Sequence, residues 1–261
     1  SAGGMQADEA PEDIVLTDHV MGIAFHPSSN MIAASTVDGV VELVQYSLEG
    51  NIRQASSKHH TDSCRALTFN QDGNILYTAS ADASIAAFDI GSGRPGAQLT
   101  NAHDTAVSCI AMVDEHMLAS GDDDGVIKIW DLRQHKCAHT LSEHEDFIAD
   151  IRLGPDGRTL LCAGGDGHLS VWNRKSGKLT AMSDQLEDEL LSLQVLKGGR
   201  KVLCGTQSGV LQVFSWGDWG DVSDRFPGHP QSVQCMVKVD EQTVFTCSED
   251  GIIRVVQVCV C

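Results

Sequence analysis

Short apolar segments alternate with polar turns along the whole chain, and this pattern predicts β-strands. Residues 117–120 are small and apolar, and residues 126–130 alternate in polarity after a tight turn. Equivalent turns recur at Asp38-Gly39, Asp82, Asp124-Gly125, Asp166-Gly167, Ser208-Gly209 and Asp250-Gly251. These turns lie 44, 42, 42, 42 and 42 residues apart. A regular period in this range is typical of a β-propeller, in which each repeat forms one antiparallel sheet.

The sequence therefore predicts an all-β fold, a β-propeller of four-stranded antiparallel blades. In each repeat a turn containing histidine precedes the first strand, and the Asp-Gly turn joins the second strand to the third. Six repeats are expected near residues 19–58, 59–101, 102–142, 143–186, 187–227 and 228–261, which makes residues 11–261 one domain. Residues 1–10 are rich in glycine, alanine and acidic side chains and are expected to form a disordered tail.

Acidic side chains outnumber basic ones, 36 to 18, which gives a formal net charge of −18. This charge repels phosphate backbones, so sequence-independent binding of nucleic acid is not expected, and a basic protein partner is favoured. The sequence contains neither a membrane-spanning run of about 18 apolar residues nor the pattern of a signal peptide. We therefore expect no membrane association and a location in the nucleus or cytosol.

The nine cysteines and eleven histidines follow the repeat, which indicates structural roles for both. The cysteines lack the paired spacing of zinc sites and are interpreted as small buried apolar residues. Those on predicted first or second strands are Cys64, Cys109, Cys235, Cys162, Cys204 and Cys247. The histidines that begin repeats are His19, His60, His103, His144 and His229. Because no catalytic motif is present, we expect no enzyme activity, no cofactor and no metal.

The third repeat resembles the WD-repeat family. His103, Ser120, Asp124 and Trp130 occupy the positions at which that family has a hydrogen-bonded tetrad joining three strands. The resemblance implies that Asp124 is the structural acceptor, and that Trp130-Asp131 is the dipeptide of the family name. The tetrad is less complete elsewhere, where apolar packing is expected to hold the strands. The departures are Phe88 for the tryptophan of the second repeat, Cys162 for the hydroxyl of the fourth, and Ser208 and Phe214 in the fifth.

Longer strings resemble one eukaryotic family, that of WD repeat-containing protein 55, over residues 11–258. They are PEDIVL at 11–16, AFHP at 24–27, CRA at 64–66, VDE at 113–115, ASGDD at 119–123, HEDFIAD at 144–150, SDRF at 223–226 and DGIIR at 250–254. The resemblance implies a nuclear and nucleolar protein without catalytic activity. It further implies support of ribosomal RNA processing and large-subunit assembly, with basic pre-ribosomal proteins as partners.

The WD family usually closes with seven repeats, whereas six are recognised here. One explanation is that Ile14-Val15-Leu16 supplies the outer strand of the sixth repeat, so that six blades close. The alternative, which we favour, is that a last repeat is missing and that the alternating end, residues 258–261, is encoded by an intron. An open ring would be costly, because it would leave the apolar faces of two blades in water and their burial contributes roughly 25 cal/mol per Å².

Residues Trp130-Asp131-Leu132-Arg133 resemble the Trp-Asp-x-Arg box through which many WD propellers bind the damaged-DNA-binding adaptor of cullin-4 ubiquitin ligases. The resemblance assigns adaptor recognition to Arg133 and makes a ligase substrate receptor the alternative function. Such a short string also occurs in propellers that bind no ligase, so both functions remain open.

Two further features are candidate protein-binding positions. Trp216 and Trp219 fall between the third and fourth strands of the fifth repeat, on the same edge as Arg133. They either form an exposed contact or fold back over their own blade. On the opposite edge, acidic residues would suit a basic partner or would simply form a solvated rim. These residues are Asp104, Asp123, Glu145 and Asp146.

Overall fold

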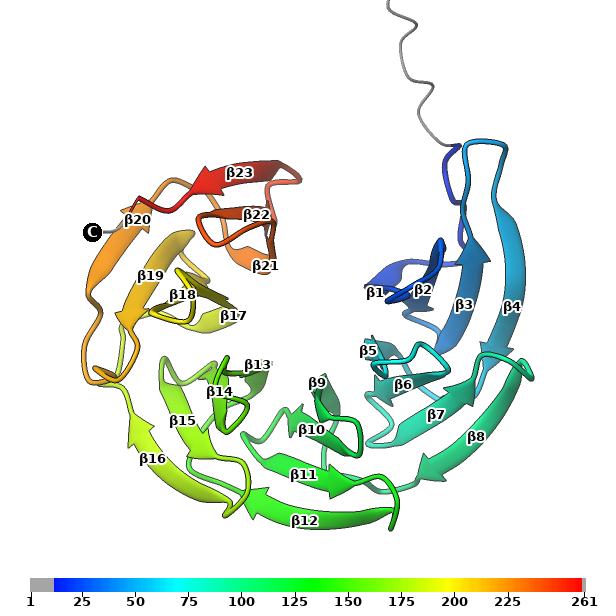
Figure 1. Ribbon diagram of the computed structural model, residues 1–261, viewed down its shortest axis with the longest axis horizontal. Coiled ribbons are helices and arrows are strands. Elements are labelled where there is room, and N and C mark those ends of the chain that lie inside the picture. Colours follow the sequence, from blue (N-terminus) through cyan, green and yellow to red (C-terminus); the bar gives the residue numbers. More distant parts are fainter. Residues whose placement is uncertain (1–11, 260–261) are drawn as a thin grey trace, which may run out of the picture. The chain divides into compact units, whose positions relative to one another are not determined.

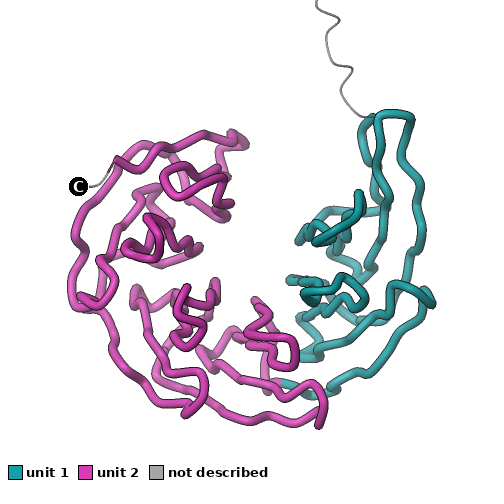
Figure 2. The backbone as a smooth tube through the Cα atoms, in the orientation of Figure 1, with its two compact units in different colours: residues 1–102 teal, residues 103–261 magenta. Residues whose placement is uncertain are grey.

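The computed structural model describes residues 12–259, so the expected tail at residues 1–10 lies outside the described residues. Strands joined by turns make up this range, and it contains no helix (Figure 1). It accordingly has no helix that is long and apolar enough to cross a membrane. The chain forms two compact units, residues 1–102 and residues 103–261 (Figure 2).

The first unit contains two four-stranded sheets in which every strand pairs with its sequence neighbour in antiparallel orientation. The first sheet consists of β1 (Val20–Phe25), β2 (Met31–Thr36), β3 (Val40–Gln45) and β4 (Ile52–Lys58). The second sheet consists of β5 (Cys64–Phe69), β6 (Ile75–Ser80), β7 (Ile85–Asp89) and β8 (Arg94–Leu99). Apolar side chains of the two sheets share one buried cluster, which includes Leu43, Leu76 and Phe88.

The second unit continues the same plan with four sheets (Figure 1). The third sheet consists of β9 (Val107–Asp114), β10 (Met117–Asp122), β11 (Ile127–Asp131) and β12 (Lys136–Leu141), and the fourth of β13 (Ile148–Leu153), β14 (Thr159–Gly164), β15 (Leu169–Asn173) and β16 (Lys178–Met182). The fifth consists of β17 (Leu190–Leu196), β18 (Lys201–Thr206), β19 (Val210–Ser215) and β20 (Asp224–Pro227), and the sixth of β21 (Val233–Lys238), β22 (Thr243–Ser248) and β23 (Ile253–Gln257). Buried clusters join the third sheet to the fourth, the fourth to the fifth, and the fifth to the sixth.

The predicted fold class, an all-β propeller built from antiparallel blades, is confirmed. Each sheet falls inside one of the six expected repeats. The recurring turn has a physical requirement for glycine, because Gly125 and Gly167 both have a φ of 79°. A Cβ at Gly125 would also lie 2.7 Å from the backbone oxygen of His144. The turn between the second and third strands therefore packs against the segment that leads into the next sheet.

The sixth sheet has three strands within the described range. The explanation in which Ile14, Val15 and Leu16 form an outer strand is wrong, because this segment is not a strand. It lies instead along the first sheet, where Arg53 Nη2 donates to the Val15 oxygen at 3.0 Å. The adjacent Thr17 amide donates to Glu42 Oε1 at 3.1 Å. These hydrogen bonds hold the segment on its own unit by side-chain contacts instead of by strand pairing.

The cysteines divide into two groups. Cys64, Cys109, Cys162 and Cys204 are buried, as predicted. Cys247 is only partly buried and Cys235, its partner across β21 and β22, is exposed, so the prediction was wrong for these two. Both lie on the sixth sheet, the last of its unit, which packs against the fifth sheet. The position of the repeat that is buried as Cys109 in the third sheet is thus exposed to solvent as Cys235 in the sixth sheet.

Candidate functional site

A buried hydrogen-bond network joins three segments of the third sheet. His103, in the turn before β9, places Nδ1 2.7 Å from Asp122 Oδ2 and Nε2 2.6 Å from Ser120 Oγ. Trp130, on β11, donates from Nε1 to the same Ser120 oxygen at 2.8 Å. Since a carboxylate can only accept, Nδ1 of His103 carries the proton, and in the neutral ring Nε2 accepts from the Ser120 hydroxyl. Three of the four residues expected from the WD tetrad, His103, Ser120 and Trp130, therefore meet.

The acceptor in this network is Asp122, and its assignment to Asp124 is corrected. Asp122 Oδ1 also accepts from the amides of Asp124 and Val126, at 3.1 and 2.8 Å, so one carboxylate both holds the histidine and closes the turn. Asp124 is left exposed at the tip of the turn. Burial alone would raise the pKa of Asp122, but its hydrogen bonds with His103 and the Val126 amide outweigh burial and lower the pKa.

The connectivity from Asp122 through His103 to Ser120 is that of a catalytic serine triad. The residues are nevertheless closed to solvent, with exposed fractions of 0% for Ser120, 2% for His103 and 2% for Asp122. The Ser120 oxygen is moreover occupied by the indole of Trp130. A serine nucleophile must reach a substrate carbonyl, and this one cannot, so the arrangement can join strands but cannot attack a substrate.

The fourth sheet contains an equivalent network in which the hydroxyl comes from a residue on a different strand. Cys162 stands where the third sheet has Ser120, and Ser170 of the neighbouring strand β15 supplies the hydroxyl instead. Ser170 Oγ lies 2.7 Å from His144 Nε2 and accepts from Trp172 Nε1 at 2.7 Å. His144 Nδ1 lies 2.9 Å from Asp166 Oδ2. Burial would raise the pKa of Asp166, but the hydrogen bond with His144 outweighs it and lowers the pKa to about 2.

Ser170 is the functional residue that reasoning from the repeat did not find. The repeat places the hydroxyl on the second strand, whereas here it comes from the third. Cys162 and Ser170 are direct partners across β14 and β15, so their side chains reach the same point of the sheet. A search for serine or threonine across the strand pair would have found this residue. The network of the fourth sheet is therefore complete, contrary to the prediction that it had decayed.

The remaining sheets keep only parts of the network. In the second sheet, His60 Nε2 lies 2.8 Å from Thr78 Oγ1, and the Phe88 ring that replaces the tryptophan stacks on His59. In the sixth sheet, His229 Nε2 lies 2.8 Å from Thr246 Oγ1. In the first sheet, His19 is exposed and its ring lies 3.1 Å from Oδ1 of its neighbour Asp18, away from any strand hydroxyl among residues 12–259. The fifth sheet has no histidine, and its Ser208 bonds to Asp188.

Arg133 follows β11 and presents its guanidinium to solvent, with 62% of the side chain exposed. Asp131 accepts from Arg133 Nε at 3.2 Å and from Nη2 at 2.9 Å. The bonds to this carboxylate and its charge raise the pKa of Arg133. The result is a surface arginine whose guanidinium is held in one orientation by a neighbouring carboxylate.

Trp216 and Trp219 are half-buried against the apolar cluster shared by the fourth and fifth sheets. Their rings meet edge to face with centroids 5.0 Å apart. Trp216 also lies so close to Gly154 that a Cβ there would come within 2.4 Å of the ring. The two rings thus cover the core of their own unit and keep part of their surface open.

The four acidic candidates lie at the end of the second unit that carries its Asp-Gly turns. Asp104, Glu145 and Asp146 precede first strands and are exposed, while Asp123 lies in the turn after β10 and is partly buried. Arg133 lies at the other end of β11. Acidic candidates and Arg133 are therefore separated by the length of a strand. Within residues 12–259, no group of three or more histidine, cysteine, aspartate or glutamate side chains is arranged to hold a metal ion.

Comparison with known proteins identifies similar chains over almost the whole length. The WDR55 family model matches residues 11–260. WD repeat-containing protein 55 of Bos taurus is 41% identical over 252 residues, which are 96% of this chain and 66% of the relative. The Arabidopsis thaliana protein of the same name is 44% identical, covering 94% and 70%, and the Danio rerio protein is 46% identical, covering 96% and 65%. The chain thus spans about two thirds of the length of the relatives it matches.

Proposed function

Because this chain belongs to the WDR55 family of WD-repeat proteins, we propose that it is a non-catalytic protein-interaction scaffold of the nucleus and nucleolus that supports ribosomal RNA processing and ribosome biogenesis. Proteins built from WD-repeat propellers typically act as scaffolds. The nucleolar role rests on the resemblance of the chain to its family, and the scaffold role also rests on how this chain uses its own residues.

The observation that carries the scaffold proposal is the burial of the triad-like constellation of the third sheet. His103, Ser120 and Asp122 have the residue types and connectivity for acyl transfer, yet they are sealed inside the third sheet and bonded to Trp130. A site that must admit a substrate needs an accessible nucleophile. The side chains that remain exposed at one end of the second unit include the carboxylates of Asp104, Glu145 and Asp146, and such surfaces recognise partners by complementary charge.

The acidic end of the second unit fits a basic partner. Asp104, Glu145 and Asp146 are exposed there and lie on turns before the third and fourth sheets. Rigid sheets present these turns in fixed positions, which limits the entropy lost on binding. A basic segment of a pre-ribosomal protein is therefore the partner that we propose for this end.

The test is to deplete the full-length protein from its own cells and to follow precursors of ribosomal RNA. Depletion should cause precursors to accumulate, and the wild-type protein should restore their processing. Asp104→Lys/Glu145→Lys should fail to restore it, whereas the control Asp218→Lys/Asp221→Lys, an equal charge change at the other end of the unit, should succeed. Normal precursor levels after depletion would contradict the proposal.

A second function is favoured by the accessibility of Arg133. The side chain is exposed, and Asp131 fixes its guanidinium, as expected of a recognition arginine. We propose as the alternative that the chain is a substrate receptor which binds the cullin-4 ligase adaptor through Trp130, Asp131, Leu132 and Arg133.

Capture of the purified adaptor by the full-length protein separates the two functions. Arg133→Ala should abolish capture if the chain is a receptor, while Lys136→Ala, a nearby exposed cation, should leave capture intact. Retained capture by Arg133→Ala would remove the receptor function. Normal ribosomal RNA processing by the same variant would at the same time support the scaffold function.

A further inference from the structure

One short loop of the second unit concentrates positive charge in an acidic chain. Several half-buried cations pair with a carboxylate, as Arg152 does with Asp150 and Arg174 with Asp114. By contrast, Lys197, Arg200 and Lys201, in and beside the loop between β17 and β18, have no carboxylate within 4.0 Å among residues 12–259. The chain has twice as many acidic as basic residues, so carboxylates to pair with these three cations are plentiful. Because the three cations form no ion pair within the described range, they are available to bind an anionic ligand.

The three cations line one pocket. It has a volume of about 570 Å³ and is completed by Ser215, Trp216 and Gln242. Lys201 Nζ donates to Ser215 Oγ at 2.9 Å and to Ser223 Oγ at 3.2 Å. These neutral hydroxyls position the ammonium group without cancelling its charge. The pocket therefore combines an aromatic wall with three cations that form no ion pair with another described residue, of which Lys197 is close enough to Asp240 for its charge to act on that carboxylate.

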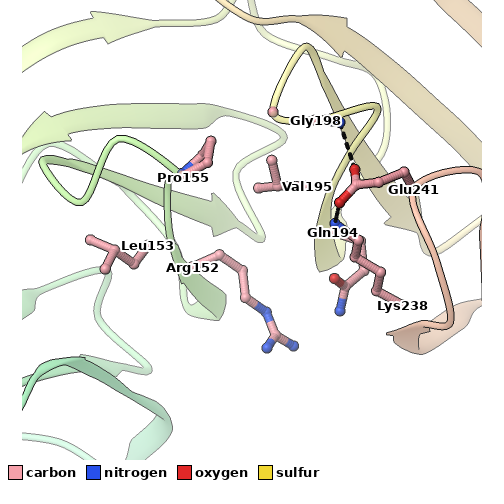
Figure 3. A pocket seen from close by; sticks show the side chains of 9 residues that line it. Arg152, Leu153, Pro155, Gln194, Val195, Gly198, Lys238 and Glu241 are labelled. Carbon is pink, nitrogen blue, oxygen red and sulfur yellow. Dashed lines mark hydrogen bonds and ion pairs between the residues drawn. The ribbon is translucent and has the colours of Figure 1, made fainter.

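Figure 3 shows a second pocket, of about 410 Å³. It adjoins the first, since Gly199 lines both. Its apolar wall is formed by Leu153, Pro155 and Val195. Arg152 and Lys238 also line this pocket, but each pairs with a carboxylate, Arg152 with Asp150 and Lys238 with Glu241, which lines the pocket as well (Figure 3). The second pocket thus contributes mainly an apolar wall, and the three cations without an ion pair to a described residue lie in the first pocket.

The loop that separates the pockets is held in place. Lys197, Gly198 and Gly199 have φ values of 58°, 65° and 83°. The Lys197 amide donates to the Glu241 backbone oxygen at 3.0 Å, and the Gly198 amide donates to the Glu241 carboxylate. A Cβ at Gly199 would lie 2.4 Å from Pro155 Cγ. Loops of the fourth, fifth and sixth sheets are therefore fastened together, and the two pockets exist before any ligand binds.

The chemistry of the pockets selects one kind of ligand. Free phosphate would use the cations but leave the walls formed by Trp216 and Leu153 unused. A nucleic acid carries a negative charge on every nucleotide, so the net charge of −18 repels it more strongly than a peptide in which only alternate residues are acidic. An extended peptide places every second side chain roughly 6.6 Å apart, so neighbouring pockets can take alternate residues while acidic side chains meet the cations. Arginine and tryptophan are also the residue types that contribute most at protein interfaces.

We propose that these adjoining pockets bind an extended peptide segment of a partner protein in which acidic and apolar residues alternate. This surface is distinct from the acidic end of the unit and from Arg133, and it has the opposite charge preference to the acidic end. It does not depend on a role in ribosome biogenesis, so the two proposals can fail separately.

The test is binding of a fluorescein-labelled twelve-residue peptide, in which glutamate and aspartate alternate with leucine and phenylalanine, measured by anisotropy with the purified protein. Binding should weaken as salt is raised and should fall at least tenfold when the acidic residues are replaced by glutamine and asparagine. Lys197→Glu/Arg200→Glu should weaken binding at least tenfold. The control Lys175→Glu/Lys178→Glu makes the same charge change on another hairpin of the unit and should stay within twofold of the wild type.

A milder pair, Lys197→Gln/Arg200→Gln, should weaken binding at least threefold and serves if charge reversal impairs folding. Equal weakening by the control would overturn the proposal, because it would show attraction to overall charge alone. Undiminished binding by both loop variants, or failure of the acidic peptide to bind, would also overturn it. If a twelve-nucleotide uridylate bound more tightly than the acidic peptide and this binding depended on Arg200, the ligand of the pockets would be a nucleic acid and the peptide proposal would be overturned.

Discussion

The third and fifth sheets have the same strand order but join their strands by different means. In the third, Ser120 and Trp130 complete a polar network with His103. In the fifth, Cys204 and Phe214 stand at the corresponding positions, fully buried within an apolar cluster. The blade plan therefore does not require the polar network, and apolar packing is sufficient to form it.

The difference also shows why a polar network, once present, must be complete. A typical hydrogen bond contributes only about 1 kcal/mol net, but a buried donor or acceptor left without a partner costs about 1–3 kcal/mol. The fifth sheet avoids this cost by burying apolar groups at both positions. The third and fourth sheets avoid it by satisfying every member, even where the hydroxyl must come from another strand.

The largest expected effect is at the centre of the network. His103→Ala leaves the buried Asp122 carboxylate without its partner, and this should lower the free energy of unfolding by about 3–5 kcal/mol. The matched control is His19→Ala, because His19 begins the first repeat but its side chain is 92% exposed. That control should change stability by less than about 0.5 kcal/mol. Urea unfolding of the two variants checks both values, and equal losses would contradict the difference between buried and exposed histidines.

The relocated hydroxyl of the fourth sheet offers a rescue experiment. Ser170→Ala should cost about 2–3 kcal/mol, because His144 Nε2 and Trp172 Nε1 lose their shared partner. Adding Cys162→Ser places a hydroxyl at the direct cross-strand position and should recover at least about 1 kcal/mol. Thermal unfolding of the single and double variants gives the coupling. A double variant no more stable than Ser170→Ala would show that the hydroxyl has no role there.

The same substitution should act in the opposite sense in the fifth sheet. Cys204→Ser buries a hydroxyl where neither a histidine nor a tryptophan is available, and it should cost about 1–2 kcal/mol. Cys162→Ser alone should be close to neutral, because the hydroxyl enters beside an existing network. Calorimetry of both variants makes the comparison, and a neutral Cys204→Ser would mean that the new hydroxyl donates to Gln212 Oε1, the buried acceptor directly across the strand pair that has no hydrogen-bond partner among the described residues.

Acid should weaken the second sheet through its two adjacent histidines. Burial lowers the pKa of His60, and burial together with the charge of His60 lowers the pKa of His59 to about 4. Since the unfolded histidine has a pKa of 6.5, the unfolded state binds more protons between these values, and stability must fall as pH decreases from 6.5 to about 4. His59→Gln should reduce this loss by on the order of 1 kcal/mol. Urea midpoints across this pH range provide the measurement, and an unchanged pH profile would be inconsistent with a neutral buried pair.

The smallest effect is expected at the surface. Arg133→Ala removes an exposed ion pair with Asp131, and solvent-screened pairs of this kind contribute little to stability. Its unfolding midpoint should therefore match that of the wild type closely. A large loss of stability would assign Arg133 to the fold instead of to recognition.

The repeat period was enough to predict the sheets and three members of the third network, because strand alternation and turn glycines recur at fixed spacing. It could not place the acceptor, since three consecutive aspartates, Asp122, Asp123 and Asp124, offer equivalent chemistry and only packing selects one. Ser170 was missed because contact across strands is not a sequence spacing. Cys235 was misjudged because its burial depends on the sheet that packs beside it.

The central claim is that the triad-like residues of the third sheet join strands and perform no chemistry. It is tested most directly by the free energy of unfolding of Ser120→Ala, measured by urea denaturation. The account predicts a loss of about 2–3 kcal/mol, because His103 Nε2 and Trp130 Nε1 both lose their buried partner. A stability equal to that of the wild type would contradict it.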